Sequence, residues 1–253
     1  MTTTRLAIIG GTGLDQFPDL EITTHSEMDT PYGAIAAPLT HARLNGHELI
    51  FLARHGESHH LPPHRVNYRA NLWALHAAGV RHIIAVTAVG GITPAMAPGV
   101  IALPDQIIDY TADRTHTFFD GPPNSVEHID FTWPYDARLR QSLLRAAESL
   151  GLAVQPKATY GATQGPRLET AAEIRRMERD GCDLVGMTGM PEAALARELN
   201  IAYAGCSLVV NWAAGKTEAV ITMDDIRQQL DSGMARVRRL LTTTVGLVYS
   251  RSS

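Results

Sequence analysis

Short apolar runs alternate with helix-like segments along this chain, and that alternation limits its fold more than any other feature of the sequence. The first apolar run, 6–9, ends at a glycine-rich turn, and Asn45-Gly46 predicts a hairpin turn within 41–53. Strands that alternate with helices predict an α/β protein with a central mixed β-sheet flanked by helices. The predicted strands are 6–9, two strands within 41–53, 83–89, 100–110, 183–187 and 202–210.

The predicted helices are marked by signals at their ends. Thr170 and Glu173 have the spacing of a capping box, and Gly151 closes a helix over 136–150. A C-terminal helix capped by Thr222 has an apolar residue every three or four positions, at Ile226, Leu230, Met234, Val237 and Leu241. The remaining helices are predicted at 66–78, 170–180 and 191–199. The long loop 112–135 is a candidate functional element.

The composition fits one folded domain over residues 1–253. With 45% hydrophobic and 19% charged residues, the chain can bury a core, and no linker-like segment divides it. Its 22 Lys and Arg residues against 26 Asp and Glu residues leave a net charge of −4, without a polybasic run. This balance argues against nucleic acid as a partner and favours a small neutral or anionic ligand.

The sequence contains no signal for a membrane or an oxidising compartment. No apolar run approaches about 18 residues, and the start of the chain lacks the regions of a secretory signal, so we expect a cytoplasmic location. Cys182 and Cys206 lie in apolar, strand-like runs. Because two cysteines cannot complete a metal site, we expect them to be reduced and buried.

Arg54-His55-Gly56-Glu57 follows a predicted strand and resembles the signature of histidine phosphatases, in which a histidine is the phosphoryl nucleophile. A phosphomonoesterase is therefore one alternative function, and a non-catalytic nucleotide-binding module is another. In the phosphatases the motif normally ends the first strand, whereas here a strand-loop and a hairpin precede it. The position of the motif counts against a phosphatase.

A group of histidines follows the same strand, at positions 55, 59, 60 and 64. A spacing of four could align metal ligands on one face of a helix. Pro62-Pro63 prevents a helix from reaching His64. We therefore expect a histidine-rich surface loop and no metal site.

Side chains that suit an anion gather at the ends of predicted strands. Thr12, Arg54, His55 and Thr87 each end or follow a strand, where open α/β sheets bind their ligands. Hydroxyl, guanidinium and imidazole groups together can bind phosphate. The sequence thus predicts a phosphate site at this edge of the sheet.

Ordered motifs covering about residues 5 to 230 make the resemblance specific: IIGGTGL (8–14), DTPYG (29–33), LARHG (52–56), VNYRAN (66–71), TAVGGI (87–92), TQGPRLET (163–170) and MTGMPEAALARE (187–198). With them the chain resembles the trimeric nucleoside phosphorylase family, which contains methylthioadenosine phosphorylase and purine nucleoside phosphorylase. The resemblance implies that Met187 contacts the ribose. It implies a phosphate site made of Thr12, Arg54, His55, Thr87, Ala88 and Thr188.

The family's reaction displaces a purine from the anomeric carbon of a ribosyl group with phosphate, through an oxocarbenium-like transition state. The resemblance therefore implies a pentosyltransferase of purine salvage, with phosphate as a co-substrate and with neither a metal nor another cofactor. It also implies a homotrimer, in which His128 reaches the 5′ pocket of the neighbouring subunit. The catalytic residues carried over are His55, Glu169 and Asn211.

The residues at the expected base site favour a 6-oxopurine. Such a base presents a ring N–H donor beside an oxygen acceptor, which a carboxylate and an amide can bind, and Glu169 and Asn211 supply these groups. The adenine-specific branch has a serine in place of Glu169 and aspartates in place of Asn211 and Ala213. Leu168 stands where the family usually has an aromatic residue that stacks on the base, so we expect weaker stacking.

The 5′ end of the substrate is expected to meet apolar side chains. The branch that binds a 5′-hydroxyl uses a histidine in the C-terminal region, and no histidine occurs after His128. Met223 and Ile226 lie in the matching region and could bury a thioether methyl group. The sequence therefore favours a 5′-methylthio 6-oxopurine nucleoside, with inosine or guanosine and methylthioadenosine as alternative substrates.

Overall fold

The computed structural model describes residues 5–11, 13–14, 17–121, 125–218 and 222–250. Its strands are β1 (Leu6–Gly10), β2 (Glu21–Ser26), β3 (Leu39–Leu44), β4 (His47–Ala53), β5 (His82–Gly91), β6 (Ile101–Ala102), β7 (Gln106–Asp109), β8 (Thr159–Ala162), β9 (Leu184–Gly186) and β10 (Ala202–Trp212). Its helices are η1 (Pro63–Arg65), α1 (Tyr68–Ala77), α2 (Ala137–Ser149), α3 (Ala171–Arg179), α4 (Gly189–Glu198) and α5 (Met223–Ser250).

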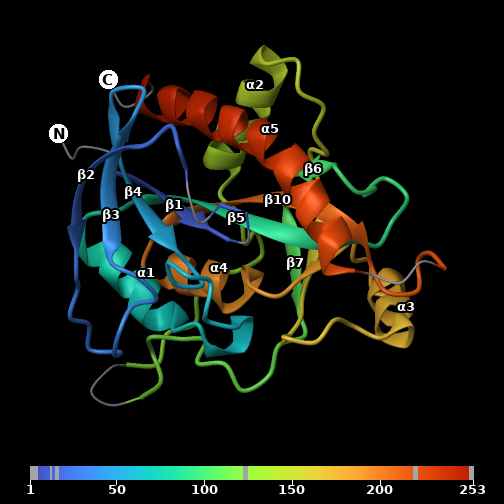
Figure 1. The fold of residues 1–253 in the computed structure, drawn as a ribbon. Coiled ribbons are helices and arrows are strands. Elements are labelled where there is room, and N and C mark those ends of the chain that lie inside the picture. The colour runs from blue at the N-terminus through green and yellow to red at the C-terminus, as the bar shows by residue number, and fades with distance from the viewer. Residues whose placement is uncertain (1–4, 12, 15–16, 122–124, 219–221, 251–253) are drawn as a thin grey trace.

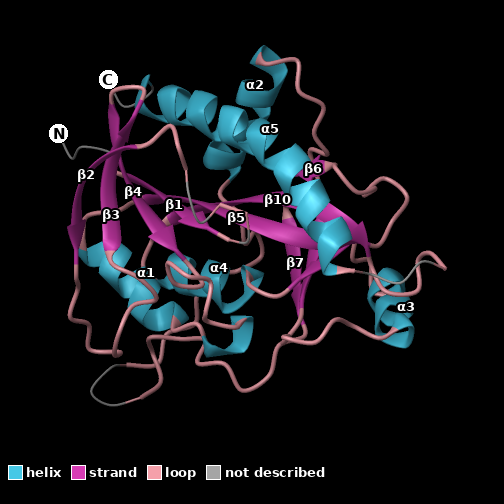
Figure 2. Ribbon diagram, in the orientation of Figure 1, coloured by secondary structure: helices cyan, strands magenta, loops and turns pink. Residues whose placement is uncertain are grey.

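The strands form one mixed sheet, as predicted, in the order β2-β3-β4-β1-β5-β9-β8-β7, with β10 paired to β5 and β6 (Figure 2). β1 is parallel to both of its neighbours, and β5 is parallel to β1 and to β10. All five residues of β1 are buried. A strand with partners on both sides and helices above and below it has no face toward water, which explains its continuous apolar sequence.

Helices cover both faces of this sheet (Figure 1). α5 and α2 lie on one face, where α5 packs on β10, and α1 and α4 lie on the other. The apolar positions predicted for α5 are all buried, namely Ile226, Leu230, Met234, Val237 and Leu241. Burial of this stripe against the sheet confirms the prediction made from its spacing.

Several local predictions are confirmed in detail. Thr170 Oγ1 accepts a hydrogen bond from the Glu173 amide at 3.1 Å, and the Glu173 carboxylate accepts one from the Thr170 amide at 2.7 Å, so α3 has a complete capping box. In the β3–β4 turn, Asn45 and Gly46 have φ angles of 50° and 78°. Positive φ at both positions is the requirement of a two-residue hairpin turn.

One predicted strand is wrong, and two strands of the structure were not predicted. The segment 100–110 is not one strand, because β6 pairs with β10 whereas β7 pairs with β8, and Pro104, which has no amide proton, lies between them. β2 and β8 were not predicted from the sequence. β2 is an exposed edge strand without apolar alternation, and β8 has four residues, so neither gives a hydrophobic pattern long enough to detect.

Cys182 and Cys206 are both free and buried, as expected. No helix within the described ranges is both long and apolar enough to cross a membrane.

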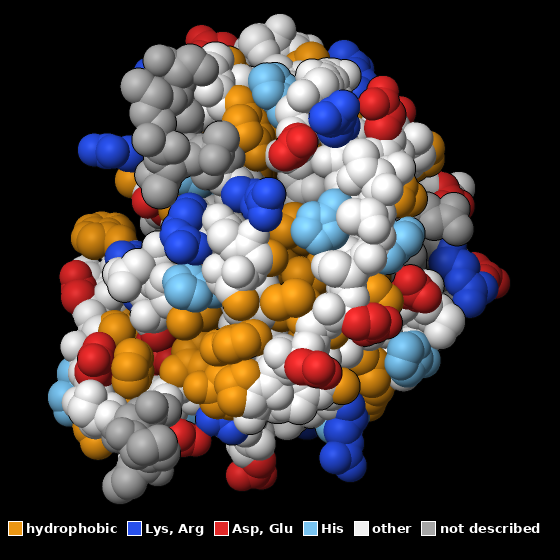
Figure 3. Space-filling view, turned by 90° about the vertical axis from the view of Figure 1, so that its left-hand side faces the viewer, with side chains coloured by type: hydrophobic (Ala, Val, Ile, Leu, Met, Phe, Trp, Pro, Cys, Tyr) orange, Lys and Arg blue, Asp and Glu red, His pale blue; other side chains and the backbone are white. Residues whose placement is uncertain are grey.

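On the face of the molecule that carries β2 and β3, hydrophobic side chains gather into a patch among histidine and charged side chains (Figure 3). Large exposed apolar side chains include Val126 and Trp133 in the long loop.

Candidate active site

A cavity of about 580 Å³ opens at the carboxyl ends of the central strands. β4, β1, β5 and β10 are neighbours in this order, each parallel to the next. Arg54 and His55 directly follow β4, Gly11 follows β1, and Asn211 lies near the end of β10. Since parallel strands end at the same edge of the sheet, these residues meet in the cavity wall.

The structure brings most of the predicted site residues together. The cavity lining includes Arg54, His55, Thr87, Ala88, Leu168, Glu169, Met187, Thr188, Asn211 and Ile226. Thr12 lies outside the described residues, and so does the side chain of Met223. His128 is exposed on the long loop and is not part of the lining within the same chain.

Arg54 is fully buried and forms a bidentate ion pair with Glu192 of α4. Nε donates to Oε2 at 2.7 Å and Nη2 donates to Oε1 at 2.8 Å, while Tyr203 Oη donates to Oε1 at 2.8 Å. Burial opposes the charge of Arg54, but the Glu192 carboxylate outweighs this effect and raises the pKa of Arg54 above its ordinary value. The guanidinium is therefore permanently charged and fixed in one orientation.

The ion pair leaves part of the guanidinium for a ligand. Nη1 donates to the Val86 carbonyl at 3.0 Å, so the bonds described use three of the five N–H groups. Gly11 lies close against the same group, because a Cβ atom there would come within 2.9 Å of Arg54 Nη1 and 2.7 Å of the Val86 oxygen. Only glycine allows β1 to end against Arg54.

His55 is held as a neutral ring. Its Nδ1 lies 2.8 Å from the Leu61 carbonyl oxygen, which can only accept, so Nδ1 carries the proton and Nε2 is an acceptor. Burial of the ring, helped by the neighbouring charge of Arg54, lowers the pKa of His55 to about 4. A neutral imidazole with a free acceptor can bind a protonated phosphate oxygen.

Hydroxyl groups complete this side of the cavity. The sequence predicted that Thr87 ends a strand, but Thr87 lies inside β5, which continues to Gly91. Its Oγ1 lies 2.8 Å from Ser207 Oγ, its register partner on β10, and both side chains are buried. Thr188 precedes α4, and its side chain makes no capping hydrogen bond. The Thr188 amide donates to Tyr160 Oη at 3.3 Å, whereas its hydroxyl, in the cavity lining, can donate to an anion.

The opposite side of the cavity carries Glu169 and Asn211. Glu169 precedes the N-cap of α3, and it is the one carboxylate in the described lining. Asn211 follows an irregularity in β10, where Val209 pairs with Val89 and Asn211 with Gly90. Its Nδ2 donates to the Trp212 carbonyl at 2.7 Å, which orients the amide. Ala213, buried at 3% exposure, also lines the cavity.

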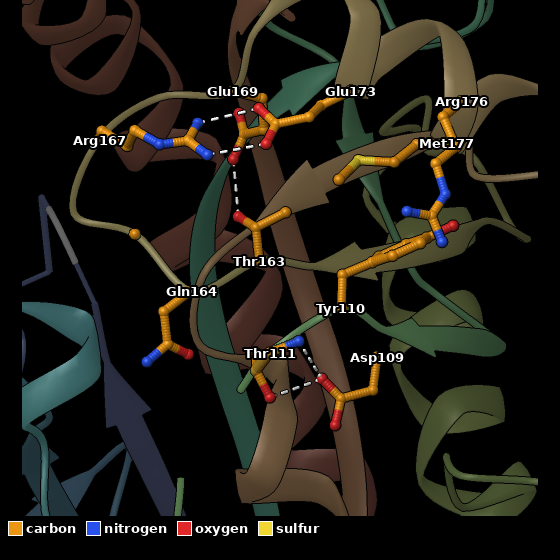
Figure 4. Close-up of a pocket in the computed structure, with 11 residues that line it drawn as sticks. Asp109, Tyr110, Thr111, Thr163, Gln164, Arg167, Glu169, Glu173, Arg176 and Met177 are labelled. Atoms are coloured by element: carbon orange, nitrogen blue, oxygen red, sulfur yellow. Dashed lines mark hydrogen bonds and ion pairs between the residues drawn. The ribbon is translucent and has the colours of Figure 1, made fainter. Parts of the chain in front are cut away.

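A second cavity, of about 390 Å³, lies on the other side of Glu169 (Figure 4). Its wall includes Thr163, Arg167, Glu173 and Tyr110. Among the described residues, Glu169 is the one that both linings share. The base-side carboxylate therefore stands in the wall between two cavities.

Several residues of the larger cavity's wall were not predicted from the sequence. His59, His60 and the segment 61–63 line the cavity, although the loop was expected only to lie on the surface, and the His55 and His59 rings are 4.6 Å apart. Within the described ranges no group of three or more histidine, cysteine or acidic side chains could hold a metal. Glu192 was not singled out either, although an acid among the buried residues of α4 is a signal for a buried ion pair.

Comparison with known proteins identifies the family. A model described as the phosphorylase superfamily matches residues 5–246, so the chain belongs to this superfamily. The chain is 56% identical over 235 residues to a probable S-methyl-5′-thioinosine phosphorylase of Pseudomonas syringae, covering 93% of this chain and 96% of that one. It is 43% identical over 249 residues to the 6-oxopurine nucleoside phosphorylase of Pyrococcus furiosus, covering 96% and 93%.

The fold agrees with solved structures. A methylthioadenosine phosphorylase from Schistosoma mansoni in complex with adenine superposes with a TM-score of 0.93, at 30% identity, over 98% of this chain and 92% of that chain. The central mixed sheet with flanking helices is thus the nucleoside phosphorylase fold, as expected. Membership of this superfamily also replaces the histidine phosphatase interpretation of Arg54-His55-Gly56-Glu57.

Removing the Glu192 carboxylate should destabilise the folded protein. Glu192→Ala leaves the Arg54 charge buried without its partner, and we expect the free energy of unfolding to fall by about 3–5 kcal/mol. Urea denaturation measures this loss. The matched control is Glu48→Ala, which breaks the exposed Arg43–Glu48 pair and should cost less than about 1 kcal/mol. Equal losses in the two variants would contradict a dominant role for the buried pair.

His55 should make stability depend on pH. Its folded pKa of about 4 lies below the ordinary 6.5, so the stability that the neutral ring contributes is complete above pH 6.5 and is lost as the pH falls toward 4. At about 1.4 kcal/mol per pKa unit, the loss approaches about 3 kcal/mol. Urea denaturation from pH 7 to pH 4 should show this extra loss in the wild type relative to His55→Gln. Parallel pH profiles would contradict it.

Proposed function

We propose that this protein catalyses the phosphorolysis of S-methyl-5′-thioinosine to hypoxanthine and 5-methylthioribose 1-phosphate. The observation that carries the proposal is that one cavity is lined by anion-binding groups, including Arg54 and His55, and by Glu169 and Asn211. The similarity to a probable S-methyl-5′-thioinosine phosphorylase and to a 6-oxopurine nucleoside phosphorylase supports this substrate class. The enzyme is accordingly a pentosyltransferase of the purine nucleoside phosphorylase type.

Recognition of the base follows from donor and acceptor positions. The Glu169 carboxylate accepts a hydrogen bond from the ring N1–H of hypoxanthine. The Asn211 amide forms hydrogen bonds with O6 and the neighbouring imidazole nitrogen. Adenine has an acceptor at N1 and a donor at C6, so it would leave Glu169 facing a lone pair. A buried polar mismatch costs about 1–3 kcal/mol per group, and sites built on such bonds discriminate by about 10⁴ or more.

Phosphate occupies the side of the cavity near Arg54. The two remaining N–H groups of the guanidinium, the hydroxyls of Thr87 and Thr188 and the Ala88 amide are its donors, and His55 Nε2 accepts a hydrogen bond from its protonated oxygen. Glu192 already balances the charge of Arg54. The guanidinium therefore contributes hydrogen-bond donors in a fixed geometry more than it contributes net positive charge. Donors fixed in this way stabilise the transition state more than they stabilise bound phosphate.

In the reaction, a phosphate oxygen forms a bond to C1′ as the C1′–N9 bond breaks, and the bonding electron pair leaves with the purine. The proton lost by hydrogen phosphate is balanced by the proton gained on the purine ring. Asn211 stabilises the departing base as its imidazole nitrogen is protonated, and the anion lies beneath the developing oxocarbenium ion. Met187, also in the lining, packs against the ribose.

The 5′ end supports two substrates. Ile226, 9% exposed, offers an apolar contact for a methylthio group, to which each methylene-sized group contributes about 0.8 kcal/mol. His59 and His60 in the same lining offer donors for a 5′-hydroxyl, which favours inosine as the second candidate. The relative rates of the two nucleosides decide between them.

The substrate proposal is tested by measuring released base from methylthioinosine, inosine, methylthioadenosine and adenosine, with and without phosphate. We expect phosphate-dependent release of hypoxanthine, with kcat/KM for methylthioinosine at least about 10⁴ times that for methylthioadenosine. The variant Glu169→Ser with Asn211→Asp should reduce this ratio by at least about 10²-fold, because it removes both base contacts.

The matched control for this variant is Glu178→Ser. Glu178 is an exposed carboxylate of α3 that pairs with Lys216 and lines neither cavity, so the preference should be unchanged. Comparable turnover of methylthioadenosine by the wild type would refute the base assignment. Ligand binding without release of free base would favour a non-catalytic module.

We also propose a homotrimer, with His128 reaching a neighbouring subunit. Two large apolar side chains of the same loop, Val126 and Trp133, are 68% and 64% exposed, and hydrophobic side chains also gather on the face in Figure 3. Apolar surface of this kind is typical of protein contacts.

Light scattering should give three times the 27.5 kDa mass of one chain. If His128 completes a neighbouring site, activity per chain should fall on dilution to concentrations at which the trimer dissociates. Full activity in a monomer would contradict the shared site.

A further inference from the structure

Among the described residues, the Glu169 carboxylate forms its hydrogen bond with the side chain of Thr163. Thr163 Oγ1 lies 2.6 Å from Glu169 Oε1 (Figure 4). A carboxylate only accepts, so the hydroxyl donates its single proton. The same hydroxyl lies 3.4 Å from the Gly186 carbonyl, but the shorter contact to a charged acceptor is the stronger one. Oε1 therefore accepts this hydrogen bond, and no hydrogen bond from a described residue to Oε2 competes with a ligand there.

Thr163 itself has little freedom. It is 8% exposed and follows β8, and its amide donates to the Gly186 carbonyl of β9 at 2.8 Å. Its carbonyl accepts from Arg114 Nη2 at 3.2 Å, and the same guanidinium also binds the carbonyls of Gln164 and Met187. A β-branched side chain on a fixed backbone has restricted χ1 freedom. The hydrogen bond to Glu169 therefore starts from a hydroxyl with few alternative positions.

The segment that carries Glu169 has less support. Arg167 and Leu168, just before it, are exposed, and Arg167 is engaged elsewhere because its Nη atoms donate to both oxygens of Glu173, at 2.7 and 2.9 Å. Figure 4 shows this pair beside the Thr163–Glu169 bond. Without Thr163, the long Glu169 side chain could turn toward either cavity, and ordering it on binding would cost conformational entropy.

We infer that Thr163 is a positioning residue for base specificity, which holds Glu169 so that Oε2 meets the N1–H of a 6-oxopurine. The inference rests on the proposed function. Its effect is limited to bases that carry a proton at N1, because only these use the Glu169 acceptor. A general packing role for Thr163 would instead affect every nucleoside alike.

The test compares methylthioinosine with the methylthio nucleoside of unsubstituted purine, whose N1 has no proton. Thr163→Val keeps the shape but removes the donor, and we expect kcat/KM for methylthioinosine to fall about 10- to 100-fold, with a change of less than about threefold for the purine nucleoside. Thr163→Ser keeps a hydroxyl, so its kcat/KM for methylthioinosine should lie within about threefold of the wild-type value.

Two further measurements separate this role from a structural one. In a Glu169→Gln background, Thr163→Val should cost much less than in the wild type, since the two residues act through one bond. Thr93→Val is the matched control, because Thr93 Oγ1 donates to the Asp183 carboxylate at 3.2 Å and neither residue lines either cavity. Its preference between the two nucleosides should equal that of the wild type.

Each other outcome has a definite meaning. Equal losses on both nucleosides, or wild-type behaviour of Thr163→Val, would overturn the positioning role while the proposed function stands. If Thr163→Val does not fold, Thr163→Ala, which also removes the hydroxyl, takes its place in both comparisons, and full additivity of Thr163→Ala with Glu169→Gln would overturn the positioning role. A wild-type enzyme without preference for methylthioinosine over methylthioadenosine would overturn the proposed function and this inference together.

Discussion

The ion pair between Arg54 and Glu192 is the contact on which the rest of the site depends. It joins the end of β4 to α4, and Tyr203 of β10 donates to the same carboxylate. Both charged side chains are almost fully buried, so separating them would leave a charge in a medium that cannot solvate it. The elements around the cavity are therefore held at fixed positions before a ligand enters, which is the condition for electrostatic preorganisation.

The two ends of the cavity differ in rigidity. On one side, the residues that follow β4 and Thr87 within β5 are buried, with Arg54 at 0% exposure and His55 and Thr87 at 6%. On the other side, Glu169 follows exposed residues and hydrogen-bonds to Thr163. Under the proposed function, a rigid anion end suits chemistry that is the same for every substrate. A base end carried on a surface segment can then change specificity through a few side chains without disturbing the core.

Local features of the fold could be predicted because a few neighbouring residues determine them. The capping box of Thr170 and Glu173, the Asn45-Gly46 turn and the apolar stripe of α5 each depend on spacing within one or two turns of chain. β2 and the break at Pro104 could not be predicted in this way, since pairing partners define them and not a hydrophobic pattern. The same limit applies to the site: Arg54 and His55 could be placed at a strand end, but not their partners.

By itself the sequence determined the α/β fold, the strand end that carries Arg54 and His55, and the expectation that Glu169 and Asn211 share one cavity, which the structure confirms. Only the tertiary structure decided that Glu192, 138 residues from Arg54, is its partner, that Thr163 binds Glu169, and that His59 and His60 enter the cavity wall. The physical reason is that propensity and spacing act along the chain, whereas a buried charge or hydroxyl is satisfied by whichever group packing brings within about 3 Å.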